Sequence, residues 1–252
     1  MSSHFPQEIL DLIVDFLHDE PGALKACCLV SKSWVHRTRE HLFAHVEFTW
    51  TRNFKLWQKT FPDPSDSPAR YTRSLSIRNF EVVTLVDTGV GDWIRTFSGV
   101  VRLHVNIEYN SDRKVSLVPL HGLSPTLKSL HLVCESSTSS SEVFGLVCSF
   151  PLLEDLALDS LDDNSEFDEW DVPSTSPRLT GCLSLMVVSE IGPIVRRLLE
   201  LPSGLRFSNI SAKCLREDVE SMTDLVSKCS DTLKSLSISY FFEGGFFIYQ
   251  LL

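Results

Sequence analysis

Short segments with aliphatic residues at alternating positions recur along the chain. They begin at Leu75, Leu103, Leu130, Leu156, Leu183, Leu205 and Leu236. The intervals between them are nearly constant, except that the one before Leu205 is shorter and the one after it is longer. Alternation puts every second side chain on one face of a strand, so each segment predicts one strand with its apolar residues facing a core. The mean interval falls within the range of about 20–29 residues that is typical of leucine-rich repeats.

Three segments fit the repeat signature L-x-x-L-x-L, at residues 127–132, 153–158 and 233–238. One such unit cannot bury its apolar face alone, so we predict an α/β leucine-rich-repeat-like solenoid over residues 73–252, with the strands side by side in one parallel sheet in chain order. An ordinary α/β domain is the alternative, which the regular spacing disfavours. Between the strands, residues 142–148 and 218–229 have helical spacing, whereas residues 162–177 have the composition of a loop.

The last predicted strand is followed by an apolar tail. Nine of the thirteen residues 240–252 are apolar or aromatic, and one, Glu243, is charged. Solenoids normally end in a repeat with a polar outer face. Either the tail folds back over the open end, or the chain is a truncated product of a longer repeat protein. Gly244 and Gly245 interrupt any helix there, so we favour truncation and predict a repeat domain that lacks a C-terminal cap.

The N-terminal part of the chain, up to Phe43, predicts three short helices. Residues 9–17 are apolar at seven of nine positions, Pro6 suits a first helical turn, and Pro21 suits the start of a second helix. Ser31 is a candidate N-cap for a third helix over residues 31–43. Three short helices cannot bury so much apolar surface among themselves. The excess is therefore covered either by the rest of the chain or by another protein.

The residues that carry this pattern resemble an F-box. They are Phe5, Pro6, Glu8, Ile9, Leu10, Ile13, Leu17, Leu24, the run CLVSKSW at 28–34, His-Leu-Phe at 41–43, and Val46. Phe5 stands where the family usually has Leu, and Ser31 where it usually has Cys. The resemblance implies a three-helix module that docks on the Skp-type adaptor of cullin–RING ubiquitin ligases. The residues that would share core and adaptor-binding roles are Pro6, Ile9, Leu10, Ile13, Leu17, Leu29, Val30, Trp34, Leu42 and Phe43.

This division gives an all-α F-box module at residues 1–48 and the repeat domain at 73–252. Residues 49–72 form a helix and a linker rich in Pro and Ser. The helix is predicted over residues 53–61 with Phe54, Trp57 and Phe61 on one side, where Trp57 is a core residue. Residues 62–68 have the composition of a turn-rich linker.

The charge distribution argues against nucleic acid as a partner. The net charge of the 252 residues is −10, and residues 151–171 hold nine acidic side chains and no basic one. We interpret residues 154–171 as a solvated acidic loop or, alternatively, as a docking surface for a basic partner. No basic stripe is visible that could neutralise several phosphates. No secretory signal and no membrane-spanning run are visible either, which predicts a cytoplasmic or nuclear protein that is not secreted and binds no membrane.

Candidate catalytic chemistry is weak. Gly89 and Gly91 lack the third glycine of a dinucleotide-binding loop, and His41 and His45 lack a third metal ligand. The seven cysteines contain no CxxC pair. We therefore predict no enzyme, no cofactor and no metal. Two functions stay open: an F-box adaptor that presents an unknown protein substrate through its repeats, or a repeat scaffold that recruits no ligase.

Overall fold

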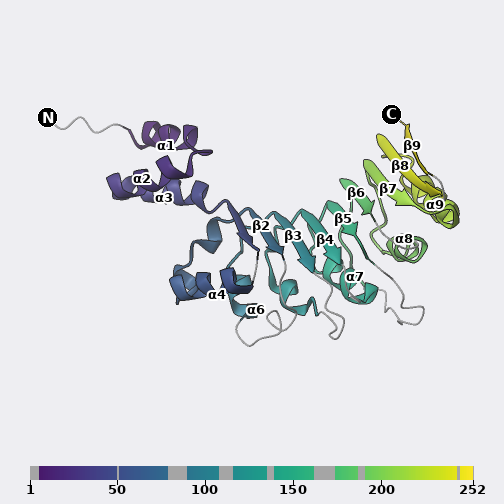
Figure 1. Ribbon diagram of the computed structural model, residues 1–252, viewed down its shortest axis with the longest axis horizontal. Helices are drawn as coiled ribbons and strands as arrows, with labels where there is room; N and C mark the ends of the chain where they lie inside the picture. The colour runs from purple at the N-terminus through teal and green to yellow at the C-terminus, as the bar shows by residue number, and fades with distance from the viewer. Residues whose placement is uncertain are drawn as a thin grey trace.

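The computed structural model describes residues 6–49, 51–78, 90–107, 116–134, 139–161, 174–186, 191–242 and 245–251. Three helices come first: α1 (Gln7–Phe16), α2 (Pro21–Val30) and α3 (Lys32–Leu42). A nine-stranded sheet with helices along one side follows them (Figure 1).

The strands of the sheet stand in chain order, as the repeat pattern predicts. They are β1 (His45–Phe48), β2 (Ser74–Arg78), β3 (Arg102–Ile107), β4 (Ser129–Cys134), β5 (Asp155–Asp159), β6 (Cys182–Met186), β7 (Asn209–Cys214), β8 (Ser235–Phe242) and β9 (Gly245–Leu251). The first eight strands are parallel, and β9 runs antiparallel to β8. The predicted parallel sheet is therefore confirmed.

Two rows of inward-facing side chains run across the sheet. The first row is Val46, Leu75, Leu103, Leu130, Leu156, Leu183, Ile210 and Leu236, each paired in register with the next. The second row, two positions further along each strand, runs from Phe48 through Ile77, Val105 and Leu132 to Ile238. From β1 to β7 these side chains are buried in one continuous core. Burial of each large aliphatic side chain contributes about 1.5–3 kcal/mol, so stacking of the repeats is the main stabilising force.

The structure corrects one of the seven predicted strands. Leu205 does not begin a strand: it forms an isolated bridge with Leu179, and the strand itself is β7, with Ile210 in the inward row. With Ile210 in place of Leu205, the short and the long interval of the sequence pattern become nearly equal, from Leu183 to Ile210 and from Ile210 to Leu236. Leu205 and Phe207 alternate like strand residues, but they lie just before the strand and are buried there.

The sheet begins one strand earlier than predicted. Residues 45–48, which the sequence assigns to the helical module, form β1 beside β2, and Val46 pairs with Leu75 of the next repeat. The helical module thus ends at Leu42, and the repeat architecture starts almost directly after it.

Helices cover the inner face of the sheet on one side of the molecule (Figure 1). They are α4 (Thr51–Thr60), α6 (Val90–Arg95), α7 (Ser140–Cys148), α8 (Gly192–Leu199) and α9 (Val219–Cys229), with 3₁₀ turns η1 (Pro64–Asp66), η2 (Pro68–Tyr71), η3 (Val118–Gly122) and η4 (Arg216–Asp218). The helices predicted at 142–148 and 218–229 are present, each with a shifted start. Most of the predicted loop at 162–177 lies outside the described residues, as do Gly89 and Phe5.

Residues 49–72 join the helical module to the first repeat. In α4, Phe54 is buried, and its ring lies 5.2 Å from that of Phe48. Trp57 packs at 5.9 Å from both Phe43 and Phe97. Trp57 is therefore a core residue, as predicted, and this aromatic cluster closes the N-terminal end of the solenoid.

The C-terminal tail covers the last edge of the parallel sheet. In β9, Leu251 pairs with Leu236 and Tyr249 with Ile238. Of the two alternatives, the tail therefore folds back. The prediction that the end of the repeat domain is uncovered is wrong for the edge of the sheet. Pairing of β9 satisfies backbone groups of β8 that would otherwise face solvent.

A buried carboxylate ties two neighbouring repeats together. Asp218 is 1% exposed. Its Oδ1 accepts hydrogen bonds from the backbone N–H of Ile191 at 2.9 Å and of Gly192 at 3.1 Å, at the start of α8, and its Oδ2 accepts one from Leu215 at 2.7 Å. The carboxylate satisfies orphan donors at a helix N-terminus, where negative charge is favoured.

We expect Asp218→Asn to lower the free energy of unfolding by about 1–3 kcal/mol, because an amide N–H₂ group would replace one acceptor and leave backbone donors unsatisfied. The matched control is Asp224→Asn on the exposed side of α9, which should leave stability unchanged. Chemical unfolding measures both, and an equal effect of the two substitutions would contradict the role given to Asp218.

Candidate functional site

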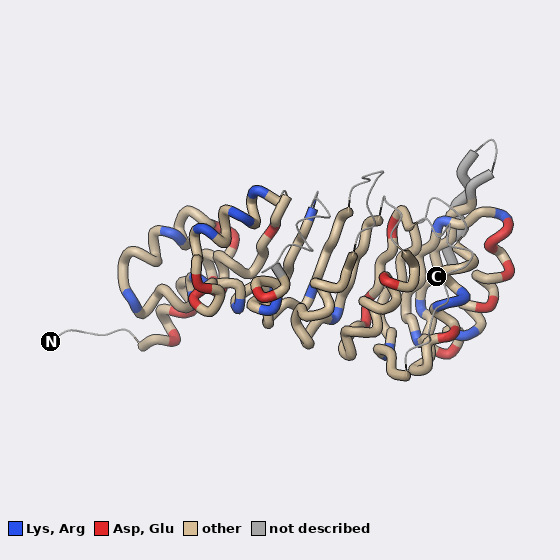
Figure 2. The backbone as a smooth tube through the Cα atoms, turned by 90° about the horizontal axis from the view of Figure 1, so that it is seen from below, with Lys and Arg blue, Asp and Glu red and all other residues tan. Residues whose placement is uncertain are grey.

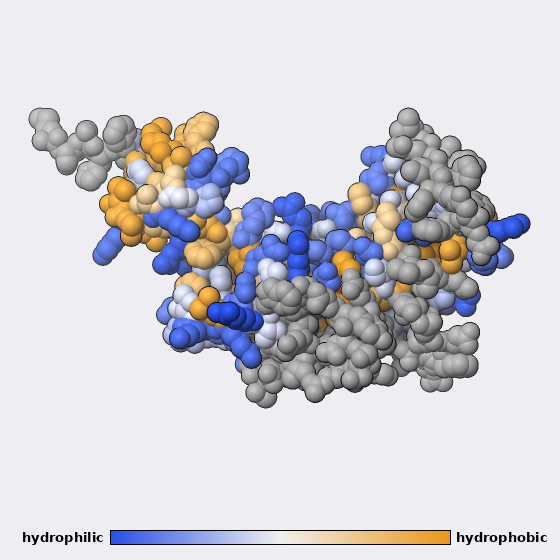
Figure 3. Space-filling model, in the orientation of Figure 1, coloured by the Kyte–Doolittle hydropathy of each residue, from blue (hydrophilic) through white to orange (hydrophobic). Residues whose placement is uncertain are grey.

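The largest exposed apolar surface of the helical module lies on α1. Ile9, Leu12, Ile13 and Phe16 have relative exposures of 42%, 52%, 43% and 85%. Their spacing of three and four positions places them on one face of the helix. Figure 3 shows hydrophobic side chains gathered over these N-terminal helices.

The end of α2 adds two further apolar side chains. Leu29 is 89% exposed and Val30 is 68% exposed. We call the six residues Ile9, Leu12, Ile13, Phe16, Leu29 and Val30 the apolar face. By contrast, the buried apolar residues of α1–α3 are only Val14, Leu24 and Cys27. The module therefore exposes more large apolar side chains than it buries, which is typical of an interaction site.

The ten residues predicted from the sequence divide into two groups. Five are exposed: Pro6, Ile9, Ile13, Leu29 and Val30. The other five are half-buried: Leu10, Leu17, Trp34, Leu42 and Phe43. Phe43 packs edge-on against Trp57 and Phe61, so it contributes to the aromatic cluster of the fold. The structure thus exposes the first group fully and the second group only in part.

The residues selected from the sequence do not include Leu12 and Phe16, although Phe16 is 85% exposed. The signal was present, because residues 9, 12, 13 and 16 have the i, i+3, i+4, i+7 spacing of one helical face. The family pattern instead includes Leu10 and Leu17.

Local signals in the sequence explain the boundaries of the helices. Pro6 is the N-cap of α1, and Pro21 occupies the first position of α2, where its missing N–H has no cost. Ser31 is the N-cap of α3, as predicted, and its Oγ accepts a hydrogen bond from the Ser33 N–H at 3.3 Å. Glu20 precedes α2 without a side-chain capping bond.

An ion network holds α1 against α3. The guanidinium of Arg37 donates from Nε and Nη2 to the two oxygens of Asp15, at 2.6 and 2.8 Å. His41 Nε2 lies 2.7 Å from Asp15 Oδ1, and Arg37 Nη1 donates to Glu40 at 2.7 Å. The hydrogen bonds from Arg37 and His41 lower the pKa of Asp15 to about 2. This network, together with the burial of Val14, holds α1 in an orientation in which Phe16 faces outward.

The outward face of the sheet offers a second, polar surface. In the middle row of this face Ser76, His104, His131 and Ala157 stand in register. The rings of His104 and His131 stack at 4.5 Å, and burial lowers the pKa of both. Both imidazoles are therefore neutral at pH 7, which makes them hydrogen-bonding and stacking groups in this row.

Catalytic chemistry finds no support in the residues that the structure describes. They contain no group of three His, Cys, Asp or Glu residues that could hold a metal ion. His41 is engaged by Asp15, and His45 lies in β1. All seven cysteines are free thiols, and burial raises the pKa of Cys148 to about 11 and that of Cys214 to about 12. Those two thiols are protonated at pH 7 and are unreactive.

Charge is mixed along the molecule. Figure 2 shows Lys and Arg residues interspersed with Asp and Glu residues along the described chain. Of the acidic segment 154–171, Asp155 and Asp159 lie in β5 rather than in a loop, and residues 162–171 are outside the described part. Within the described ranges, every helix is too short or too polar to cross a bilayer.

Removal of the Asp15 charge tests the ion network. Because the pKa of Asp15 in the folded protein, about 2, lies below its ordinary value of 3.8, its contribution is fully present above pH 4 and is lost as the pH falls towards 2. We expect Asp15→Asn to cost about 1 kcal/mol at pH 7, a modest value because the pair is partly exposed and screened by solvent. Unfolding curves of the two proteins should converge between pH 4 and pH 2. A difference that is independent of pH would contradict this account.

Comparisons of the chain with protein-family models, with curated proteins and with solved structures find no match. The candidate functional site therefore rests on geometry: an exposed apolar face on α1 and α2, held in place by α3.

Proposed function

We propose that the protein is an F-box substrate-recognition adaptor. The apolar face would dock on a Skp-type subunit of a cullin–RING ubiquitin ligase, and the repeats would hold a target protein. The observation that carries this proposal is that α1 and α2 expose six large apolar side chains, while the described helices α1–α3 bury only three apolar ones, Val14, Leu24 and Cys27. The fully buried core of a protein interface is more apolar than the rest of the surface, and the apolar face has this character.

The fold supports a separation of these two roles. The apolar face lies on helices that precede the sheet, and none of the described helices lies on the outward face of β2–β8 (Figure 1). A protein bound along this face would be held at a fixed distance from the adaptor. Such positioning raises the local concentration of a target lysine near the ubiquitin carrier, so the protein needs no catalytic residue of its own. Under this proposal the protein acts in the cytoplasm or the nucleus.

A repeat scaffold that recruits no ligase is the second candidate function. It is favoured by the contact of α3 with η2 and by the aromatic cluster around Phe43, because these contacts are those of a cap on the first repeat. Helices that served only as a cap would have their apolar side chains covered by the first repeat. A scaffold function therefore gives no role to the exposed Phe16 and Leu29. Co-purification with the Skp-type adaptor separates the two functions.

We expect the double substitution Ile13→Asp and Phe16→Asp to abolish adaptor binding, because two carboxylates would be desolvated in an apolar interface without partners. Both side chains are exposed, so the thermal unfolding midpoint should stay unchanged. These positions are better suited than Leu10, which is half-buried.

The matched control is Leu56→Asp in α4, where Leu56 is 63% exposed outside the apolar face. This variant should bind the adaptor like the wild type. Wild-type adaptor affinity of the folded double variant would refute the docking role of this face.

A further inference from the structure

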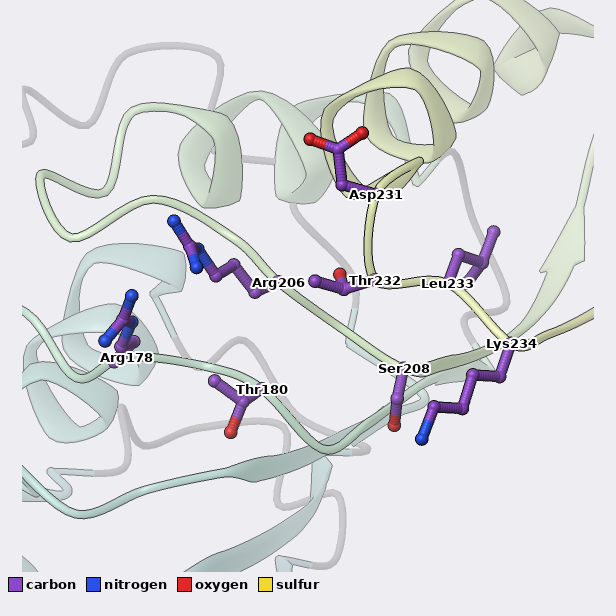
Figure 4. Close-up of a pocket in the computed structure, with 8 residues that line it drawn as sticks. All are labelled: Arg178, Thr180, Arg206, Ser208, Asp231, Thr232, Leu233 and Lys234. Carbon is purple, nitrogen blue, oxygen red and sulfur yellow. The ribbon is translucent and has the colours of Figure 1, made fainter.

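A basic pocket lies at the far end of the sheet from α1. It has a volume of about 600 Å³ and is formed where the chain approaches β6, β7 and β8. Its lining residues are Arg178, Thr180, Arg206, Ser208, Asp231, Thr232, Leu233 and Lys234 (Figure 4). Three cationic side chains and one carboxylate give the lining a net charge of +2.

The repeat spacing places the three cations on successive turns, and in Figure 4 the Lys234 side chain lies beside Ser208, on the other side of the pocket from the two guanidinium groups. Arg178, Arg206 and Lys234 follow one another at equal intervals in the sequence, each close to one repeat length. The backbone ties these turns directly: the Arg206 N–H donates to Leu179 O at 2.9 Å, and the Lys234 N–H donates to Ser208 O at 2.7 Å. Neighbouring strands lie about 4.8 Å apart, so like charges accumulate on one ridge of the solenoid.

These cations have no acidic partner in the part of the chain that the structure describes. Among the described residues, none of the three forms an ion pair with a carboxylate. Lys128, on the same edge of the sheet, pairs with Glu154 at 2.8 Å. Unpaired like charges repel one another, so a bound anion would offset this repulsion and stabilise the pocket.

A neighbouring hollow extends the basic surface. It has a volume of about 330 Å³, shares Arg206, Asp231 and Thr232 with the first pocket, and adds Lys228. Asp231 is therefore the single acidic residue that lines either hollow. Its carboxylate would repel an anion that enters from this side.

We propose that this pocket binds a phosphate monoester. Such a group carries a charge of about −1.5 to −2 and three acceptor oxygens at pH 7, which matches the net charge of the pocket and its three cationic side chains. The planar guanidinium groups of Arg178 and Arg206 suit bidentate contacts with phosphate oxygens, and the Lys234 ammonium supplies a further charge. The pocket is also large enough for the group that carries the phosphate, whether a phosphorylated side chain or a small molecule.

The experiment titrates the full-length protein with a peptide that has one phosphoserine between neutral residues, and with the same peptide without phosphate. We expect binding of the phosphopeptide only, with inorganic phosphate as a competitor. The double substitution Arg178→Gln and Arg206→Gln should weaken binding by about tenfold or more, because charge-assisted bidentate bonds are lost. Asp231→Asn should strengthen binding, since it removes the repelling charge.

The matched control is Arg102→Gln. Arg102 is an exposed arginine at the start of β3, outside the pocket, and it too has no ion pair among the described residues. This variant should bind like the wild type, and all variants should keep the wild-type unfolding midpoint, because the substituted side chains are exposed.

Phosphoserine alone binding as tightly as the phosphopeptide would identify a small molecule as the ligand, and tighter peptide binding would identify a protein. Three results would overturn the proposal: no binding of either ligand, equal weakening by Arg102→Gln, or equally tight binding of a single-stranded oligonucleotide, whose phosphates are diesters. Adaptor binding does not enter this experiment, so its outcome is independent of the proposed ligase function.

Discussion

The two rows of inward-facing aliphatic side chains are the constraint on which the rest of the structure depends. Each strand from β1 to β8 contributes one residue to each row, and their burial requires the repeats before and after. Because the rows must stay in register, the chain has to return to the same position after each repeat length, whatever the connection between the strands. The sheet therefore tolerates connections as different as the five-residue turn η3 and the eleven-residue helix α9.

A stack of this kind has two ends, and the chain treats them differently. At the first repeat, Phe43, Phe48, Phe54, Trp57 and Phe97 form an aromatic cluster that also anchors α3. At the last repeat, β9 pairs with β8 in the antiparallel sense. The helical module is thus fixed to the solenoid through α3, while α1 and α2 keep their apolar face exposed.

The sequence predicts those parts of the fold that depend on local periodicity. Six of the seven predicted strands contain the predicted inward leucine, and the three helices of the module begin near the expected proline and serine residues. The predicted strand at Leu205 was wrong, because residues also alternate in the turn that precedes β7. In β7 itself the inward positions hold Ile210 and Ala212, which the leucine pattern does not reveal. The strand β1 was not predicted, because it is short and follows a helix, so it shows too few alternating positions to be recognised. The carboxylate of Asp218 holds backbone groups of the preceding repeat, and no local pattern reveals this.

The same distinction applies to the candidate sites. The composition of α1 predicts an excess of apolar surface, but it does not show that Val14 is buried and Asp15 is bound by Arg37 and His41 while Phe16 faces outward. The distribution of charge along the sequence does not reveal the basic pocket, because Arg178, Arg206 and Lys234 come to line one pocket only when the repeats stack.

The central proposal is that the apolar face of the helical module, and not the sheet, binds the Skp-type adaptor. Hydrogen exchange of the full-length protein, with and without the Skp-type adaptor, tests it most directly. The account predicts slower exchange of amides in α1 and at the junction of α2 and α3 in the complex, with unchanged exchange in β3–β6. Slower exchange in β3–β6, with none in α1, would contradict it.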